Sequence, residues 1–173
     1  RDAQESRGLG DVYKRQALLD DRDCFRHAGY AVDVPGGAVS HQAGQWRYGR
    51  PYMLTDRIVR NVTGVSSALL MIRRDVFLSV GGFSAYQSDL RGADLGLKCQ
   101  QIGLLNVYTP YARMAMDMRL SLLPPCLTQG APKGDLRRFR QTWGEHPPER
   151  YYSPLFRPDG SMFIDLDRQE GTP

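Results

Sequence analysis

Apolar residues are most densely grouped at residues 65–73, VSSALLMIR, where they form a nearly continuous run of strand length. A run of this kind, without alternation, is typical of a strand buried on both faces. We therefore predict a central strand of a sheet at residues 68–72. Arg73 and Arg74 then end the apolar run.

A short amphipathic helix is expected directly after this strand. Its apolar stripe begins at Val76, and Asp75 places a carboxylate at the positive end of the helix dipole. Gly81 and Gly82 then break the helix, because glycine adopts positive φ readily, and Phe83 follows as an apolar anchor. The two glycines predict either an ordinary helix C-cap or a place where the backbone approaches another group closely.

A second helix and a strand complete this region. The apolar positions of residues 92–102 predict a helix, and Gly103 suits the left-handed cap that ends it. Residues 104–108 have the composition of a strand, which ends before Pro110. The order strand, helix, acidic loop, helix and strand is typical of an α/β or α+β layer structure.

Weaker patterns occupy the rest of the chain. Short strands are expected at residues 31–34 and 112–118, and a basic helix with one apolar face at residues 135–143. From Pro147 onward, prolines and aromatic residues are mixed with polar ones. We expect this tail to be extended and to be fixed to the core by its aromatic side chains.

Composition and charge narrow the classes of partner. The 173 residues are 41% hydrophobic and 24% charged, as is ordinary for a globular protein, and the net charge of +4 favours anionic partners. The basic residues are scattered, apart from Arg137, Arg138 and Arg140, and form no stripe with interleaved aromatics. We therefore expect no nucleic-acid partner. The three arginines either form a solvated helix face or contact an anionic lipid phosphate at a membrane.

The cysteines and the hydropathy bear on the compartment. Cys24, Cys99 and Cys126 are odd in number and lack CxxC spacing, which argues against a disulfide framework and against a zinc site. No apolar run approaches the roughly 18 residues of a membrane span. We expect a cytoplasmic protein whose contact with a membrane, if it has one, is peripheral. His27 and His41 are more typical of loop histidines than of metal ligands.

The chain divides into three segments by composition. Residues 1–16, RDAQESRGLGDVYKRQ, are polar and broken by glycine, and we expect a non-native or disordered leader without function. Residues 17–121 carry most of the ordered patterns. Residues 122–173 comprise a linker rich in proline and glycine, the basic helix and the aromatic tail.

Four blocks of sequence, taken in order, match a known pattern. They are FRHAG at 25–29, the segment 61–83 with VGGF, the segment 93–112 with ADLGLK and VYTPYA, and the segment 138–154 with YYSP. Together they resemble the C-terminal half of a family 2 glycosyltransferase domain of the GT-A type, from the branch that builds bacterial polysaccharides and O-antigens. The family has vGGFde, eDvDLclr, vytPyA and DPYYNP at matching places, and the resemblance covers residues 17–168.

The resemblance implies an α/β fold, namely a partial GT-A fold with a mixed sheet, whose N-terminal nucleotide-binding half is missing. It implies that a sugar passes from a nucleotide-sugar donor to a glycan or lipid-linked acceptor in polysaccharide synthesis. In the intact enzyme an upstream Asp-x-Asp would hold a divalent cation, Mg²⁺ or Mn²⁺, on the diphosphate. A carboxylate would act as general base on the acceptor hydroxyl. Residues 17–121 would be the acceptor-side half.

Candidate catalytic residues follow from the same resemblance, with three departures. The position of the general base falls on Gly92, so Asp94 and, in the preceding loop, Asp89 are the candidates that remain. Their alternatives are a helix-stabilising carboxylate and a solvated loop residue. Nothing before residue 60 resembles the nucleotide-binding half of the family, with its opening strand and Asp-x-Asp. The histidine that often follows the PyA strand falls near Asp117, which would serve as an oxygen ligand for the metal.

The substrate-binding wall would comprise Gly81, Gly82, Phe83 and Gly92. We expect Gly82 and Asp94 to lie close together across one cleft edge, and their placement on opposite faces would contradict the resemblance. For the isolated chain we expect no transferase activity. Two other interpretations stay open, namely a glycosyltransferase-like module that binds glycan or protein without catalysis, and an unrelated structural α+β domain.

Overall fold

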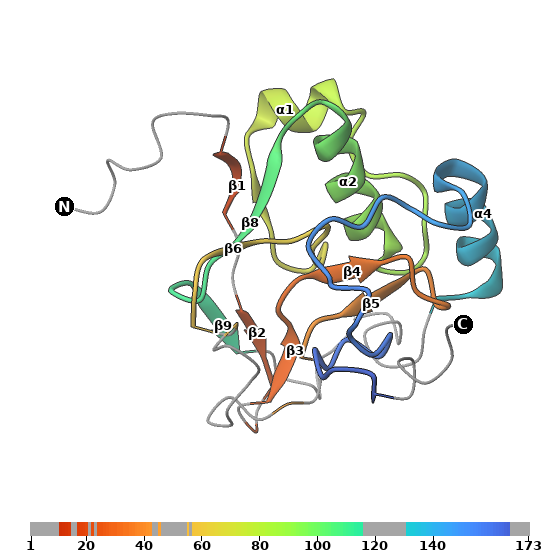
Figure 1. Ribbon diagram of the computed structural model, residues 1–173. Helices are drawn as coiled ribbons and strands as arrows, with labels where there is room; N and C mark the ends of the chain where they lie inside the picture. The colour runs from red at the N-terminus through yellow and green to blue at the C-terminus, as the bar shows by residue number, and fades with distance from the viewer. Residues whose placement is uncertain are drawn as a thin grey trace.

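The computed structural model has a mixed α/β architecture (Figure 1). The helices gather at the top and right of the view, and strands β2, β3 and β9 lie at the lower left. The expectation of an α/β class is confirmed at this level. The residues that the structure describes are 11–14, 17–20, 22, 24–42, 45, 55, 57–115 and 131–166.

The largest sheet described has four strands, in the order β6 (Arg60–Asn61), β8 (Leu105–Tyr108), β1 (Asp11–Lys14) and β7 (Met71–Ile72). Strand β1 runs parallel to β8, and the two outer strands are antiparallel to their neighbours. The prediction of a central strand at residues 68–72 is wrong, because only its last two residues form a strand and that strand is at the edge of the sheet. The backbone before them turns away to contact a helix.

The N-terminal segment also differs from its expectation. Residues 11–14 form the strand between β7 and β8, whereas residues 1–16 were expected to lie outside the fold. Val12 and Tyr13 are residue types that favour a strand. The edge of β8 that faces away from β6 offers backbone N–H and C=O groups with which such a strand can form hydrogen bonds. The remainder of residues 1–16 lies outside the described part of the chain.

Two smaller sheets complete the described β structure. Their strands are β2 (Ala17–Leu19), β3 (Phe25–His27) and β9 (Arg113–Ala115) in one sheet, and β4 (Tyr30–Val32) and β5 (Ala38–Ser40) in the other. Strand β9 is parallel to β2, while β3 pairs antiparallel with β2 and β4 forms an antiparallel hairpin with β5. Both β4 and β9 occupy places where the sequence predicts a strand.

The predicted helices are confirmed as α1 (Arg74–Ser79), α2 (Leu90–Gln101) and α4 (Lys133–Trp143). Helix α2 begins two residues earlier than its apolar pattern indicated. Gly103 has a φ of +81°, as expected for the residue that caps this helix. Helix α4 packs beside α2 on the right of Figure 1, although the two are more than thirty residues apart in sequence.

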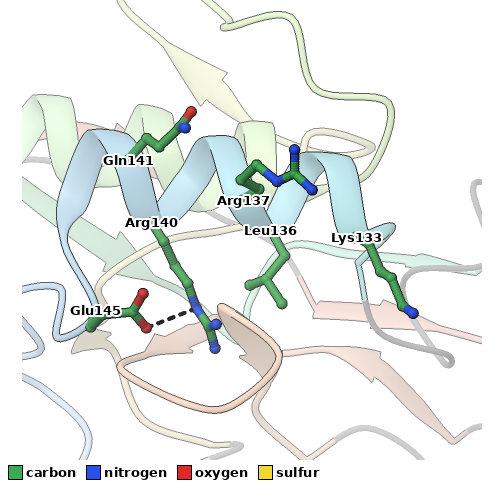
Figure 2. Close-up of a pocket in the computed structure, with 6 residues that line it drawn as sticks. All are labelled: Lys133, Leu136, Arg137, Arg140, Gln141 and Glu145. Atoms are coloured by element: carbon green, nitrogen blue, oxygen red, sulfur yellow. Dashed lines mark ion pairs between the residues drawn. The ribbon is translucent and has the colours of Figure 1, made fainter.

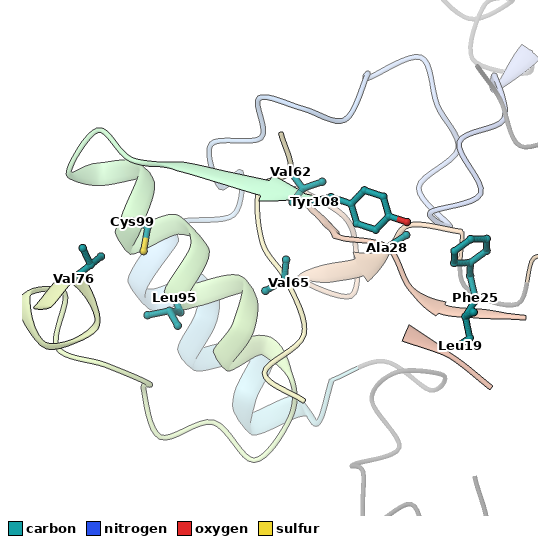
Figure 3. Packing of buried hydrophobic residues seen from close by; sticks show 9 residues of the cluster. All are labelled: Leu19, Phe25, Ala28, Val62, Val65, Val76, Leu95, Cys99 and Tyr108. Atoms are coloured by element: carbon teal, nitrogen blue, oxygen red, sulfur yellow. The ribbon is translucent and has the colours of Figure 1, made fainter. Parts of the chain in front are cut away.

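Helix α2 forms the centre of the core, because it contributes side chains to two hydrophobic clusters. Leu95 and Cys99 of α2 belong to the first cluster (Figure 3), and Leu97 with Phe139 of α4 belongs to the second. Full burial of a leucine side chain contributes about 1.5–3 kcal/mol. The first cluster comprises Leu19, Phe25, Ala28, Val62, Val65, Val76, Leu95, Cys99 and Tyr108, and the second comprises Tyr30, Val32, Tyr86, Leu90, Ala93, Leu97 and Phe139.

The tail after α4 returns to the hairpin β4–β5 through Glu149. Its carboxylate accepts hydrogen bonds from the Val32 backbone N–H at 2.7 Å and from the Thr63 hydroxyl at 2.5 Å. Tyr152 is buried and stacks on His41, with 5.1 Å between the ring centroids. The tail is therefore fixed to the core as expected, although Phe163 is exposed rather than buried.

Candidate functional site

The predicted site surrounds the first half of α2. There the backbone of the helix is in direct contact with the backbone of the segment before β7. A Cβ atom added to Gly92 would be 1.8 Å from the Val65 carbonyl oxygen, and one added to Gly96 would be 2.4 Å from the Thr63 oxygen. Both distances are far inside van der Waals contact, so these two positions admit only glycine. We call this contact of Gly92 and Gly96 with residues 63–65 the helix seat.

The helix seat is reinforced by hydrogen bonds that cross it. The side-chain amide of Asn106, on β8, donates at 2.9 Å both to the Thr63 carbonyl and to the Gly96 carbonyl. Gly92 is therefore a buried packing position, enclosed by backbone, and presents no surface to a substrate.

Asp94 is fully buried just beyond the helix seat and has a protein partner at each oxygen. One oxygen accepts a hydrogen bond from the Ser84 hydroxyl at 2.7 Å and pairs with the Lys98 ammonium at 2.9 Å. The other oxygen accepts from the indole N–H of Trp143 at 2.9 Å. Asp94 thus links the loop after α1, helix α2 and helix α4. The catalytic role of Asp94 stays a prediction, and in this geometry no open path leads a substrate to its carboxylate.

Asp89 precedes α2 and is also buried. Asp89 is the N-cap residue of α2, but its side chain makes no capping hydrogen bond. One oxygen accepts from the backbone N–H of Ser67 at 2.7 Å and from the Ser67 hydroxyl, and the other accepts from the hydroxyl of Tyr30. The expected solvated loop residue is therefore a buried link between the segment before β7 and strand β4.

Gly81, Gly82 and Phe83 directly follow the C-terminal end of α1. The two glycines have φ values of +77° and +65°, and the Gly82 N–H donates to the Phe77 carbonyl at 2.8 Å, which closes the helix as a C-cap. Phe83 remains 41% exposed and meets the Phe77 ring edge-on, with centroids 5.3 Å apart. These contacts explain all three residues structurally, and their role as a substrate wall stays a prediction.

The structure brings Gly82 and Asp94 together. The Lys98 ammonium donates to the Gly82 carbonyl at 3.2 Å and pairs with the Asp94 carboxylate at 2.9 Å. The two residues therefore lie on the same side of α2, as expected. The contact is closed by the lysine, and a pocket formed by described residues lies elsewhere, along α4.

His27 is a buried structural residue. Its Nε2 atom accepts hydrogen bonds from the backbone N–H groups of Ser66 at 2.9 Å and Gly29 at 3.2 Å. The ring proton is therefore on Nδ1, which donates to the Ser40 hydroxyl at 2.9 Å. Both nitrogens are used by the protein, which leaves none for a metal ion.

Sequence reasoning missed Arg60, which is half-buried beside His41. Its guanidinium donates to His41 Nδ1 at 3.0 Å, to the Ala28 carbonyl at 2.7 Å and to the Thr55 carbonyl at 3.1 Å, and lies 5.1 Å from the centre of the Tyr108 ring. Burial lowers the pKa of Arg60 to about 10. A single arginine in the two-residue strand β6 carries no periodic signal that would reveal its contact with His41.

Burial also holds the pKa of His41 well below its ordinary value, and the positive charge of Arg60 acts in the same direction. The ring stays neutral and accepts a hydrogen bond at Nδ1, so its proton is on Nε2. The two histidines that were expected in loops are thus both core residues.

The cation expected from the resemblance has no donor set in the described part of the chain. There, no three His, Cys, Asp or Glu side chains converge in a way that would hold a metal ion. Asp117, the predicted ligand, lies outside the described residues. Among the helices that the structure describes, none combines the length and the apolar character needed to cross a membrane.

Comparison with known proteins gives one related sequence to report. The chain is 32% identical over 114 residues to the uncharacterized protein y4gI of Sinorhizobium fredii, a match that covers 62% of this chain and 12% of that protein. No family model matches the chain, and no solved structure matches it either. The chain thus spans about an eighth of the length of this relative.

Proposed function

We propose that this chain is the acceptor-side part of a family 2 glycosyltransferase domain, which handles a glycan or lipid-linked acceptor for a sugar carried by a nucleotide-sugar donor. The observation that carries the proposal is the contact of Gly82 and Asp94 through Lys98. The resemblance required this proximity, and no local pattern in the sequence predicts it. The match to a small part of a much longer protein agrees with a domain that works within a larger chain.

In this proposal the stretch from Arg73 to Pro110 is a scaffold, and the general base comes from elsewhere. A general base must reach the acceptor hydroxyl within hydrogen-bond distance. Asp94 and Asp89 are buried and engaged at both oxygens by protein donors, and Gly92 has no room for a side chain. The Mg²⁺ or Mn²⁺ cofactor, its ligand Asp117, a cytoplasmic location and peripheral membrane contact belong to the same proposal.

Sugar transfer is the test. The full chain is mixed with UDP-, GDP- and dTDP-linked sugars, Mn²⁺ and both soluble and lipid-linked oligosaccharides, and acceptor binding is followed by ligand-observed NMR. We expect acceptor binding without transfer by the chain alone, and transfer once an upstream nucleotide-binding half from its own gene is joined to it. Transfer by the chain alone would contradict the scaffold role. Loss of both acceptor binding and transfer in the longer protein would refute the proposal.

A second candidate is a glycosyltransferase-like module that binds glycan without catalysis. The complete engagement of Asp89 and Asp94 by protein partners favours it. The same experiment separates the two candidates. A non-catalytic module would bind the acceptor in both forms and would transfer no sugar even when the upstream half is present.

A further inference from the structure

A pocket of about 380 Å³ lies along the outer side of α4 (Figure 2). It is open to solvent and is lined mostly by charged side chains. Three of these are cations and one is a carboxylate, so the lining has a net charge of +2. The lining residues are Lys133, Leu136, Arg137, Arg140, Gln141 and Glu145.

Lys133 and Arg137 are the cations of the pocket that have no ion-pair partner among the described residues. Arg140 is held in place, because its Nε pairs with the Glu145 carboxylate at 3.2 Å and its Nη2 donates to the Pro35 carbonyl at 3.2 Å. Lys133 and Arg137 are exposed, and no residue in the described ranges forms an ion pair or a hydrogen bond with either side chain. Two cations are therefore available to a ligand beside a third that is already fixed.

The positions of the cations suit one extended anionic group. Residues 133, 137 and 140 follow the i, i+4, i+7 pattern that places side chains on one helix face. They span about 10 Å along the axis at about 1.5 Å per residue. Leu136 lies between them and points toward the hairpin turn in Figure 2.

The hairpin turn between β4 and β5 packs against Leu136 and Arg140, two of the residues that line the pocket. A Cβ atom added to Gly37, which has a φ of +82°, would be 2.9 Å from the Leu136 side chain. The missing side chain at this position therefore lets the turn approach α4 closely and bring the Pro35 carbonyl to Arg140. The pocket thus combines one apolar side chain, that of Leu136, with a basic wall.

We propose that this pocket binds a phosphate-bearing ligand, of which a diphosphate is the simplest member. Arginine offers paired N–H donors to phosphate oxygens, and lysine offers a compact positive charge. Leu136 would contact the apolar part of such a ligand, and Gln141 would donate a further hydrogen bond. The phosphate is either that of a lipid headgroup or that of a soluble diphosphate. The inference concerns α4 and does not depend on sugar transfer.

Titration with pyrophosphate tests the site. Lys133 and Arg137 are both changed to Gln in one variant of the full chain. The matched control carries Arg74→Gln and Arg150→Gln, which remove the same charge from exposed positions outside α4. At about 20 mM salt, where screening is weak, we expect the first variant to lose about tenfold in affinity by calorimetry and the control to lose less than twofold.

Vesicle co-sedimentation identifies the source of the phosphate. Binding to phosphatidylglycerol vesicles but not to phosphatidylcholine vesicles, lost in the Lys133/Arg137 variant, supports a membrane headgroup. Pyrophosphate binding without vesicle binding supports a soluble diphosphate. Equal affinities of the variant and the control, or binding of neither probe by the wild-type chain, overturns the proposal. Thermal unfolding of both variants checks that each is folded, since all four residues are exposed.

Discussion

Helices α2 and α4 have nearly the same length, yet the fold holds them in opposite ways. Eight of the 12 residues of α2 are buried, whereas only Asp135 and Phe139 are buried among the 11 residues of α4. Helix α2 is therefore enclosed on almost all sides, and its glycines meet backbone directly. Helix α4 is attached along one stripe and exposes the rest of its surface.

This difference in burial determines which polar side chains are able to contact a ligand. Polar groups inside a fold are costly unless they are paired, and the carboxylates at α2 are accordingly paired with protein donors. The cations on the outer side of α4 are in water and stay available to a ligand. The motif that resembles the glycosyltransferase family thus lies on α2, where the carboxylates are bound by other parts of the protein. The cations without an ion-pair partner among the described residues lie on α4.

The largest expected effect is that of Gly92→Ala in the helix seat. The added methyl group would collide with the Val65 carbonyl, and we expect a loss of more than about 3 kcal/mol in the free energy of unfolding, measured by urea denaturation. Gly134→Ala in α4 is the matched control, because nothing lies within 4 Å of its added methyl. It should stabilise the chain by up to about 1 kcal/mol. Equal urea midpoints for the two variants would contradict the difference in packing between α2 and α4.

Asp94→Asn should have the next largest effect. It removes the ion pair with Lys98 and mismatches the Ser84 hydrogen bond inside the core, at a cost of about 2–4 kcal/mol. Asp75→Asn is the control, since the ion pair of Asp75 with Arg73 is exposed, and its urea midpoint should not move. Trp143 fluorescence reports the linked change at α4. An unchanged midpoint in Asp94→Asn would show that the carboxylate is not a structural link.

Acid should weaken the core through His41. Its pKa is depressed in the folded state, so below about pH 6.5 the unfolded chain binds a proton that the folded chain excludes. The contribution of neutral His41 to the free energy of unfolding is therefore complete above that pH. It falls as the pH is lowered toward 5, by at most about 1.4 kcal/mol per pH unit. His41→Gln should flatten this profile, measured as the urea midpoint against pH. A slope that persists in His41→Gln would contradict this.

The smallest expected change in stability is that of Phe83→Ala. The ring is partly exposed and makes one edge-on contact with Phe77, so we expect a loss of about 1 kcal/mol or less in thermal unfolding. If Phe83 is part of an acceptor wall, the variant should bind oligosaccharide several-fold more weakly. Leu78→Ala, also exposed on α1, is the control and should bind normally. Unchanged binding in Phe83→Ala would remove this residue from the proposed wall.

The helices and β8 follow from local patterns in the sequence. Their apolar periods and glycine caps act within a few residues, so Gly82 and Gly103 could be recognised without knowledge of any distant partner. The proximity of Gly82 to Asp94 was also anticipated, from the resemblance. Residues whose role depends on a neighbour close in sequence were in general placed correctly.

The roles of the polar residues, by contrast, depend on elements that are far apart in the sequence. Asp94 meets Trp143 from α4, Asp89 meets Tyr30 from β4, and Arg60 meets His41, all across long stretches of sequence. The start of the apolar run, at residues 65–67, likewise contacts α2 through its backbone, because Gly92 allows the helix to reach it. A periodic pattern records whether a residue is buried, whereas the partner it finds there depends on how separate elements come together.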